Sequence, residues 1–171
     1  MPKVLFIIAQ ENFRDVELLA PKEVLEGKGI TVEVASITTN TARGADGVMV
    51  DPNIAVKDVN LDDYDFIGVI GGPGALELYD YNEVKELLTK RAGSGKPFGA
   101  ICIAPTILAR LGLLNGKKAT TWDSNGQQVA VLQQNGAEYV EEPVVVDGNL
   151  ITANGPGAAK EFAEKIAELI G

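Results

Sequence analysis

Short apolar runs alternate with helical segments along this chain, and this alternation constrains the fold more than any other feature. The apolar runs that indicate buried strands lie at 4–9, 31–36, 66–70, 98–101 and, more weakly, 119–121. Helical periodicity of apolar residues covers 15–27, 83–92 and 158–170. Continuously apolar strands are typical of parallel sheets that helices cover on both faces. The pattern therefore predicts a three-layer α/β/α sandwich with a mainly parallel central sheet.

Three local features modify this pattern. The segment 41–50, rich in Thr and Gly, predicts a small hairpin or an irregular excursion, and 144–153 predicts an antiparallel strand pair around a tight turn. Pro21 falls inside the first helical pattern and predicts a kink or a late helix start. Because no linker or repeat interrupts the 171 residues, we expect one domain spanning 1–171.

The composition excludes several classes of function. A net charge of −9 disfavours nucleic acid and anionic membrane surfaces as partners. The absence of histidine excludes a Cys-His dyad, a Ser-His-Asp triad and a His-ligated metal, and we expect no cofactor. The first apolar run is too short to span a membrane, and a single cysteine suits the reducing cytoplasm.

Ligands of such sheets bind at the carboxyl ends of the strands. The loops 10–18, 71–77 and 102–105 follow three of the predicted strands, so we expect them to open at one edge of the sheet. Cys102 stands where a strand turns sharply into a helical pattern beginning at about Pro105. Such an elbow strains the backbone and exposes the side chain, and a helix N-terminus lowers a thiol pKa. The alternative is a buried, inert cysteine.

The other two loops offer an oxyanion pocket and a carboxyl group. The glycines at 71–74 can present backbone N–H groups to an oxyanion, or can simply make a tight turn. Glu17, between Val16 and Leu18, can point into an apolar cleft, where its pKa rises and it holds a proton for the thiol. The alternative is a solvated acid in the first turn of a helix.

The sequence GAICIAP at 99–105, after Gly71-Gly72 and DVEL at 15–18, resembles the ThiJ/PfpI superfamily over nearly the whole chain. The resemblance implies a flavodoxin-like sandwich in which Cys102 is the nucleophile and Glu17 hydrogen-bonds its thiol. It also implies that backbone amides near Gly72 and Ile103 form an oxyanion pocket. Members are homo-oligomers, either dimers or hexamers built from dimers. In the hexamers, a carboxylate at the position of Glu77 reaches the active site of a neighbouring subunit.

Two positions depart from the family pattern. The protease-like branch has a histidine directly after the nucleophile, where this chain has Ile103, and the deglycase branch has one within 120–122, where this chain has Trp122. The pocket is therefore expected to be more apolar. The base that peptidase chemistry uses is missing, and Glu77 has no imidazole to orient.

Two functions remain open. The first is a cysteine-dependent enzyme of the hydrolase, glyoxalase/deglycase or hydratase type, in which Cys102 attacks a small electrophilic substrate and Glu17 manages the proton. Its substrates would be small carbonyls such as methylglyoxal, glycated adducts or isocyanide-like compounds; the hydratase branch of the resembled family needs no histidine. The second is a non-enzymatic oxidative-stress sensor or chaperone-like protein that uses oxidation of Cys102.

Overall fold

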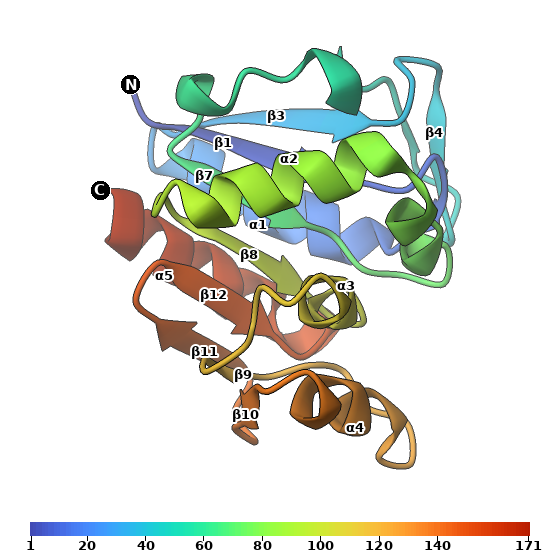
Figure 1. The fold of residues 1–171 in the computed structure, drawn as a ribbon. Coiled ribbons are helices and arrows are strands. Elements are labelled where there is room, and N and C mark those ends of the chain that lie inside the picture. The colour runs from blue at the N-terminus through green and yellow to red at the C-terminus, as the bar shows by residue number, and fades with distance from the viewer.

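The computed structural model describes residues 1–171 and contains a seven-stranded sheet between two helical layers (Figure 1). The strand order is β11-β12-β8-β7-β1-β3-β6. The strands are β1 (Lys3–Ile7), β3 (Thr31–Ser36), β6 (Ile54–Ala55), β7 (Phe66–Val69), β8 (Phe98–Ile101), β11 (Val144–Asp147) and β12 (Leu150–Ala153). All neighbours are parallel except β11 and β12, so the predicted parallel sheet with an antiparallel addition is confirmed.

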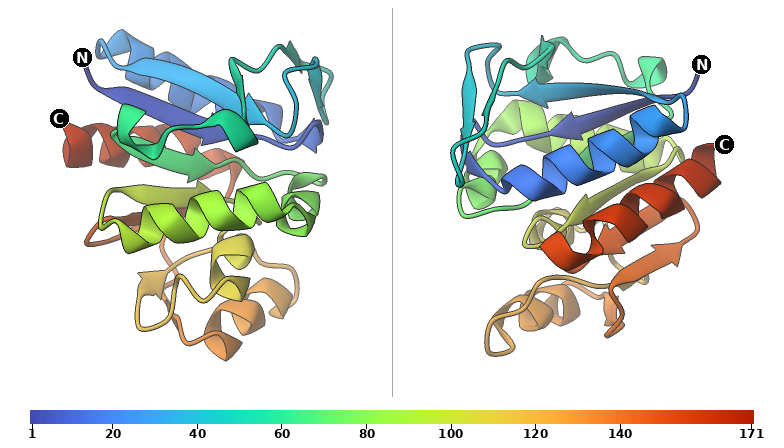
Figure 2. Two further views of the ribbon diagram at one scale, coloured as in Figure 1. Left: turned by 45° about the horizontal axis from the view of Figure 1, so that its top comes forward. Right: turned by 180° about the vertical axis from the view of Figure 1, so that it is seen from behind.

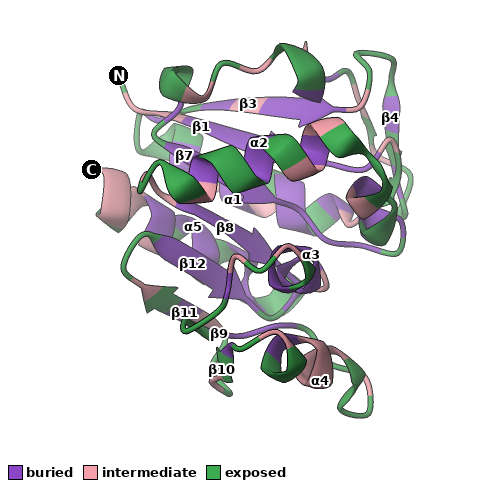
Figure 3. Ribbon diagram, viewed as in Figure 1, coloured by how far each residue is buried: buried purple, intermediate pink, exposed green.

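The helices divide between the two faces of the sheet. Helices α1 (Asp15–Gly27) and α5 (Ala159–Ile170) lie side by side on the face seen from behind, and α2 (Asn82–Gly93) and α3 (Pro105–Arg110) lie on the other (Figure 2). The central strands are buried throughout (Figure 3). Phe162 of α5 packs against the sheet, its ring centroid 6.4 Å from that of Phe6 and 6.2 Å from that of Phe66.

The predicted strand at 119–121 is wrong as a member of the central sheet. Only β9 (Lys118–Ala119) forms there, and it pairs with β10 (Glu138–Tyr139) in a separate two-stranded sheet. The cause is that Thr120 bonds to a side chain: its N–H donates to Thr152 Oγ1 over 2.9 Å. β12 takes the place beside β8 instead. Helix α4 (Gln127–Gln134), which follows this segment, has no counterpart in the sequence prediction.

Two other predictions concern where the first helix starts and whether a hairpin forms within 41–50. Helix α1 begins at Asp15 and continues through Pro21, so the predicted late start is wrong; proline removes only one helical hydrogen bond there. The hairpin predicted within 41–50 is confirmed as β4 (Ala42–Gly44) and β5 (Met49–Val50), beside β2 (Glu11–Phe13). The Asp15 carboxylate fastens the hairpin to α1 by accepting the N–H groups of Asp46 and Val48.

Four 3₁₀ helices complete the structure: η1 (Val56–Asp58), η2 (Leu61–Asp63), η3 (Ala75–Asp80) and η4 (Pro156–Ala158). None of the helices is both long enough and apolar enough to cross a bilayer. The loops after β1, β7 and β8 meet at one edge of the sheet, as predicted. There, the N–H of Arg14 donates to Gly71 O over 2.9 Å, and both residues border Cys102.

Candidate active site

Cys102 lies in a sharp turn directly after β8, and its backbone has a positive φ of 64°. This left-handed conformation is strained for a residue other than glycine and persists only where the surroundings enforce it. Three hydrogen bonds do so: Cys102 N–H donates to Ala153 O, while Cys102 O accepts from the N–H of Trp122 and from Thr121 Oγ1. The elbow expected from the sequence is therefore present, but Cys102 is buried, with 8% of the residue exposed, so the expected exposure of its side chain is wrong.

Glu17 lies in the first turn of α1 and is fully buried. Its Oε1 accepts the N–H of Gly71 over 3.0 Å, whereas Oε2 has no hydrogen-bond partner. The carboxyl group is nevertheless close enough to Cys102 for each group to shift the pKa of the other. Glu17 is thus the inward-facing carboxyl group that the sequence suggested, and the alternative of a solvated acid is wrong.

Two glycines allow this close approach. A Cβ at Gly71 would lie 2.6 Å from Cys102 Cβ and 2.8 Å from Glu17 Oε1, so only glycine fits between these side chains. Gly72 has a φ of 118°, which a side chain would disfavour. The backbone N–H groups of Gly72 and Ile103 face the Cys102 sulfur and make no other backbone hydrogen bond. They lie where the resemblance expects the oxyanion donors, and that role stays a prediction.

Burial controls the protonation of the pair. It raises the pKa of Glu17 to about 7, against the opposing effects of Cys102, Gly71 and the charge of Arg14. Burial also raises the pKa of Cys102 to about 12, and the negative charge of Glu17 adds to this effect. The predicted lowering of the thiol pKa is therefore wrong, because desolvation and Glu17 outweigh the backbone N–H groups of Ile103 and Gly72, which lower the pKa. Between these two values the pair shares one proton.

A pocket of about 350 Å³ opens in front of the sulfur. Its lining residues are Arg14, Gly72, Pro73, Cys102, Ile103, Trp122 and Pro156. Ile103 and Trp122 give it the apolar walls that the sequence predicted. Sequence reasoning missed Arg14 and Pro156; Arg14 lies three residues before Glu17 in a loop already expected at the site, so its position was the available signal.

Glu77 is not brought into this pocket. It lies on η3 with its residue exposed, and it does not line the cavity in front of Cys102. Its expected role at a neighbouring subunit stays a prediction.

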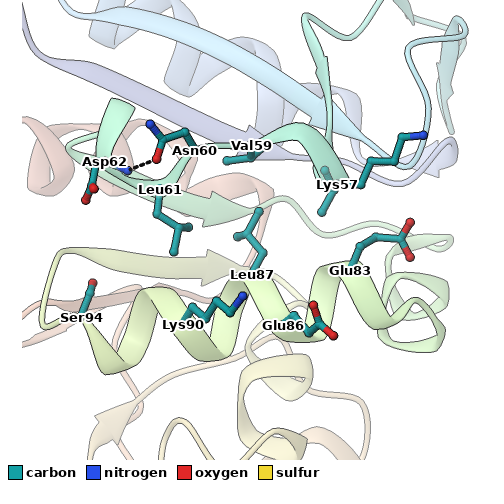
Figure 4. Close-up of a pocket in the computed structure, with 11 residues that line it drawn as sticks. Lys57, Val59, Asn60, Leu61, Asp62, Glu83, Glu86, Leu87, Lys90 and Ser94 are labelled. Atoms are coloured by element: carbon teal, nitrogen blue, oxygen red, sulfur yellow. Dashed lines mark hydrogen bonds between the residues drawn. The ribbon is translucent and has the colours of Figure 1, made fainter.

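A second hollow, of about 430 Å³, lies between α2 and the segment that contains η1 and η2 (Figure 4). Its walls carry charges of both signs, including Lys57, Asp62, Glu83 and Lys90, and it contains neither a cysteine nor a buried carboxyl group. No group of three or more His, Cys, Asp or Glu side chains is arranged to hold a metal ion. The pocket at Cys102 is therefore the place where reactive groups converge.

The chain is similar to several known proteins along almost its full length. It is 39% identical over 169 residues to the uncharacterized protein MJ0967 of Methanocaldococcus jannaschii, covering 98% of this chain and 82% of that one. It is 31% identical to the glutathione-independent glyoxalase DJR-1.2 of Caenorhabditis elegans, covering 97% and 87%. It is 30% identical to the deglycase PfpI of Pyrococcus furiosus, covering 98% and 99%.

Solved structures agree with these relatives. The crystal structure of a ThiJ/PfpI domain protein from Brachyspira murdochii matches with a TM-score of 0.92 at 26% identity, covering 98% of this chain and 95% of that one. Drosophila melanogaster DJ-1beta matches with a TM-score of 0.88 at 34% identity, covering 99% and 91%. The family model described as the DJ-1/PfpI family matches residues 2–169. The resemblance and the fold class expected from the sequence are thus confirmed, and the chain belongs to the DJ-1/PfpI family.

Proposed function

We propose that this protein is a Cys102-dependent enzyme that converts small 2-oxoaldehydes, such as methylglyoxal, into 2-hydroxy acids without glutathione. The observation that carries the proposal is the strained Cys102, placed between a buried carboxyl group and two backbone N–H groups that face its sulfur. The relatives named as a glyoxalase and as deglycases support the same class of substrate.

Each group has a role in the proposed reaction. Glu17 takes the thiol proton as Cys102 sulfur bonds to the aldehyde carbon, and the resulting oxyanion accepts hydrogen bonds from the N–H groups of Gly72 and Ile103. Glu17 returns that proton to the oxygen and then moves a proton from the aldehyde carbon to the neighbouring carbon through an enediolate, while the hydroxyl proton passes to the oxygen of the neighbouring carbon. This leaves a thioester of the 2-hydroxy acid. Water cleaves the thioester, which releases the acid and restores the thiol.

Glu17 can serve as the base in a chain that has no histidine. A general base works best when its pKa lies near the operating pH, and burial brings the pKa of Glu17 to about 7. The pocket of about 350 Å³ suits a small molecule. Peptidase activity is not part of the proposal, because neither Ile103 nor Trp122 can replace the missing imidazole.

The test is turnover of methylglyoxal by the purified protein, with lactate measured as the product and no glutathione present. We expect turnover by the wild type, none by Cys102→Ala, and at least about a hundredfold loss of kcat in Glu17→Gln. If the wild type forms no lactate although its thiol reacts rapidly with alkylating agents, the enzyme proposal fails. The oxidation sensor would then be favoured.

We also propose that the chain forms a homodimer. Large apolar side chains are exposed on α1 and on the hairpin fastened to it: Leu19 is 44% exposed, Val16 41% and Met49 62%. Contiguous exposed apolar surface commonly marks a protein–protein interface. The cytoplasmic location expected from the single cysteine stays a prediction.

A further inference from the structure

The pocket at Cys102 has one cationic side chain in its wall. Arg14 precedes α1, and its backbone N–H donates to Gly71 O over 2.9 Å, which ties it to the loop that carries Gly72. No other lysine or arginine lines this pocket. Arg14 is therefore the one basic residue in the wall of the pocket that contains Cys102, and its charge acts on the neighbouring Glu17.

The guanidinium group of Arg14 makes one ion pair, and that pair is weak. Its ion pair is with Asp46 Oδ2 at 3.5 Å, and the Asp46 side chain is 64% exposed. An exposed pair at this distance contributes little stability, so a ligand can replace it. Arginine has five N–H donors in a planar fork that matches a carboxylate group with two hydrogen bonds. The Arg14 side chain is 32% exposed, so part of any such contact would be shielded from water.

The positive charge of Arg14 contrasts with the negative net charge of the chain. A protein with a net charge of −9 repels small anions in general. A cation in the wall of the pocket is unnecessary for a neutral electrophile such as methylglyoxal. It is useful for an electrophile that carries a negative charge.

We propose that Arg14 is a specificity-determining residue that binds a carboxylate group of the substrate, so that the preferred electrophiles are anionic carbonyl compounds. This inference rests on the proposed function, which supplies the substrate, but the binding site for the carboxylate group can be tested without turnover. Arg14 orients the substrate, whereas Cys102 and Glu17 carry out the chemical steps.

The test compares two alkylating agents that differ only in charge, iodoacetate and iodoacetamide. Cys102 is the only cysteine, so intact-mass spectrometry follows a single site. The measured quantity is the ratio of the iodoacetate rate to the iodoacetamide rate at one pH, which cancels any change in thiolate population. The same ratio, measured on the chain unfolded in urea, gives the reference for an unassisted thiol.

We expect the ratio in the folded wild type to exceed the unfolded reference by about tenfold, as one charge-assisted contact allows. Arg14→Gln should return it to the reference, and Arg14→Lys should retain part of the preference. Arg43→Gln is the matched control, since Arg43 is exposed, lies outside the pocket and changes the net charge equally. A folded wild-type ratio at or below the reference, or an equal loss in Arg43→Gln, would overturn the proposal.

The two proposals fail separately. If methylglyoxal is not turned over but the ratio depends on Arg14, the enzyme proposal fails and the carboxylate site stands. If methylglyoxal is turned over and the ratio does not depend on Arg14, the enzyme proposal stands and the specificity proposal fails. Should Arg14→Gln not fold, the comparison of the wild type with Arg14→Lys decides, because lysine keeps the charge and loses the planar fork.

Discussion

Replacing Glu17 with glutamine should stabilise the folded protein at neutral and alkaline pH, because glutamine has no charge to bury. The folded state raises the pKa of Glu17 from 4.5 to about 7. A carboxylic acid whose pKa is raised on folding destabilises the protein once it ionises. The wild type therefore loses stability, relative to Glu17→Gln, as the pH rises from about 4.5 to about 7, and the difference is constant above that.

The size of the effect follows from the same shift. Moving the pKa from 4.5 to about 7 corresponds to about 3 kcal/mol. About 2 kcal/mol of this develops between about pH 5.5 and about pH 8, a range that avoids the pI near 4.5 and the ionisation of Cys102.

The assay is urea unfolding of both proteins at several pH values in the presence of a reductant. The decisive quantity is the change with pH in the difference between their free energies of unfolding. This removes any constant effect of the amide on packing. If the two stability profiles run parallel across this range, the ionised Glu17 is not buried and the description of the site is wrong.

Three other substitutions test separate parts of the structure. Gly71→Ala should lower the free energy of unfolding by about 1–3 kcal/mol and slow alkylation of Cys102, because its Cβ would lie 2.6 Å from Cys102 Cβ. Gly93→Ala, which meets no atom within 4 Å, is its control, and equal effects of the two would contradict this packing. Arg91→Ala should cost at least about 3 kcal/mol in urea unfolding, because fully buried Arg91 donates to Pro97 O and Leu61 O; a loss below about 1 kcal/mol would show that these bonds contribute little. Leu19→Glu should shift the mass measured by light scattering from dimer to monomer, and a wild type that is already monomeric would refute the proposed interface.

The sequence was informative where the hydrophobic pattern alone sets the structure. The central strands are apolar on both faces, so β1, β3, β7 and β8 could be predicted with only small errors at their ends. The segment at 119–121 misled because its hydrogen bonds involve side chains: the backbone N–H of Thr120 donates to Thr152 Oγ1, and Thr121 Oγ1 donates to Cys102 O. Such long-range bonds leave no periodic signal in a sequence.

The candidate site, too, could be predicted from the sequence only in part. The elbow at Cys102 and the inward direction of Glu17 could be anticipated from local sequence. The raised thiol pKa could not, because it depends on the burial of two acids that are 85 positions apart in the chain. Arg14 was missed because a cation before a helix is unremarkable until the fold places it in the pocket wall.

The pH dependence of Cys102 alkylation by iodoacetamide tests the central claim most directly. Because burial and the charge of Glu17 raise the pKa of Cys102 to about 12, the rate constant of the wild type should keep rising through the alkaline range without levelling off near neutral pH. In Glu17→Gln the charge that adds to this effect is gone, so the profile should move to lower pH. The same profile in both proteins, or a wild-type midpoint at about 8.5, would contradict a buried Cys102 beside an ionised Glu17.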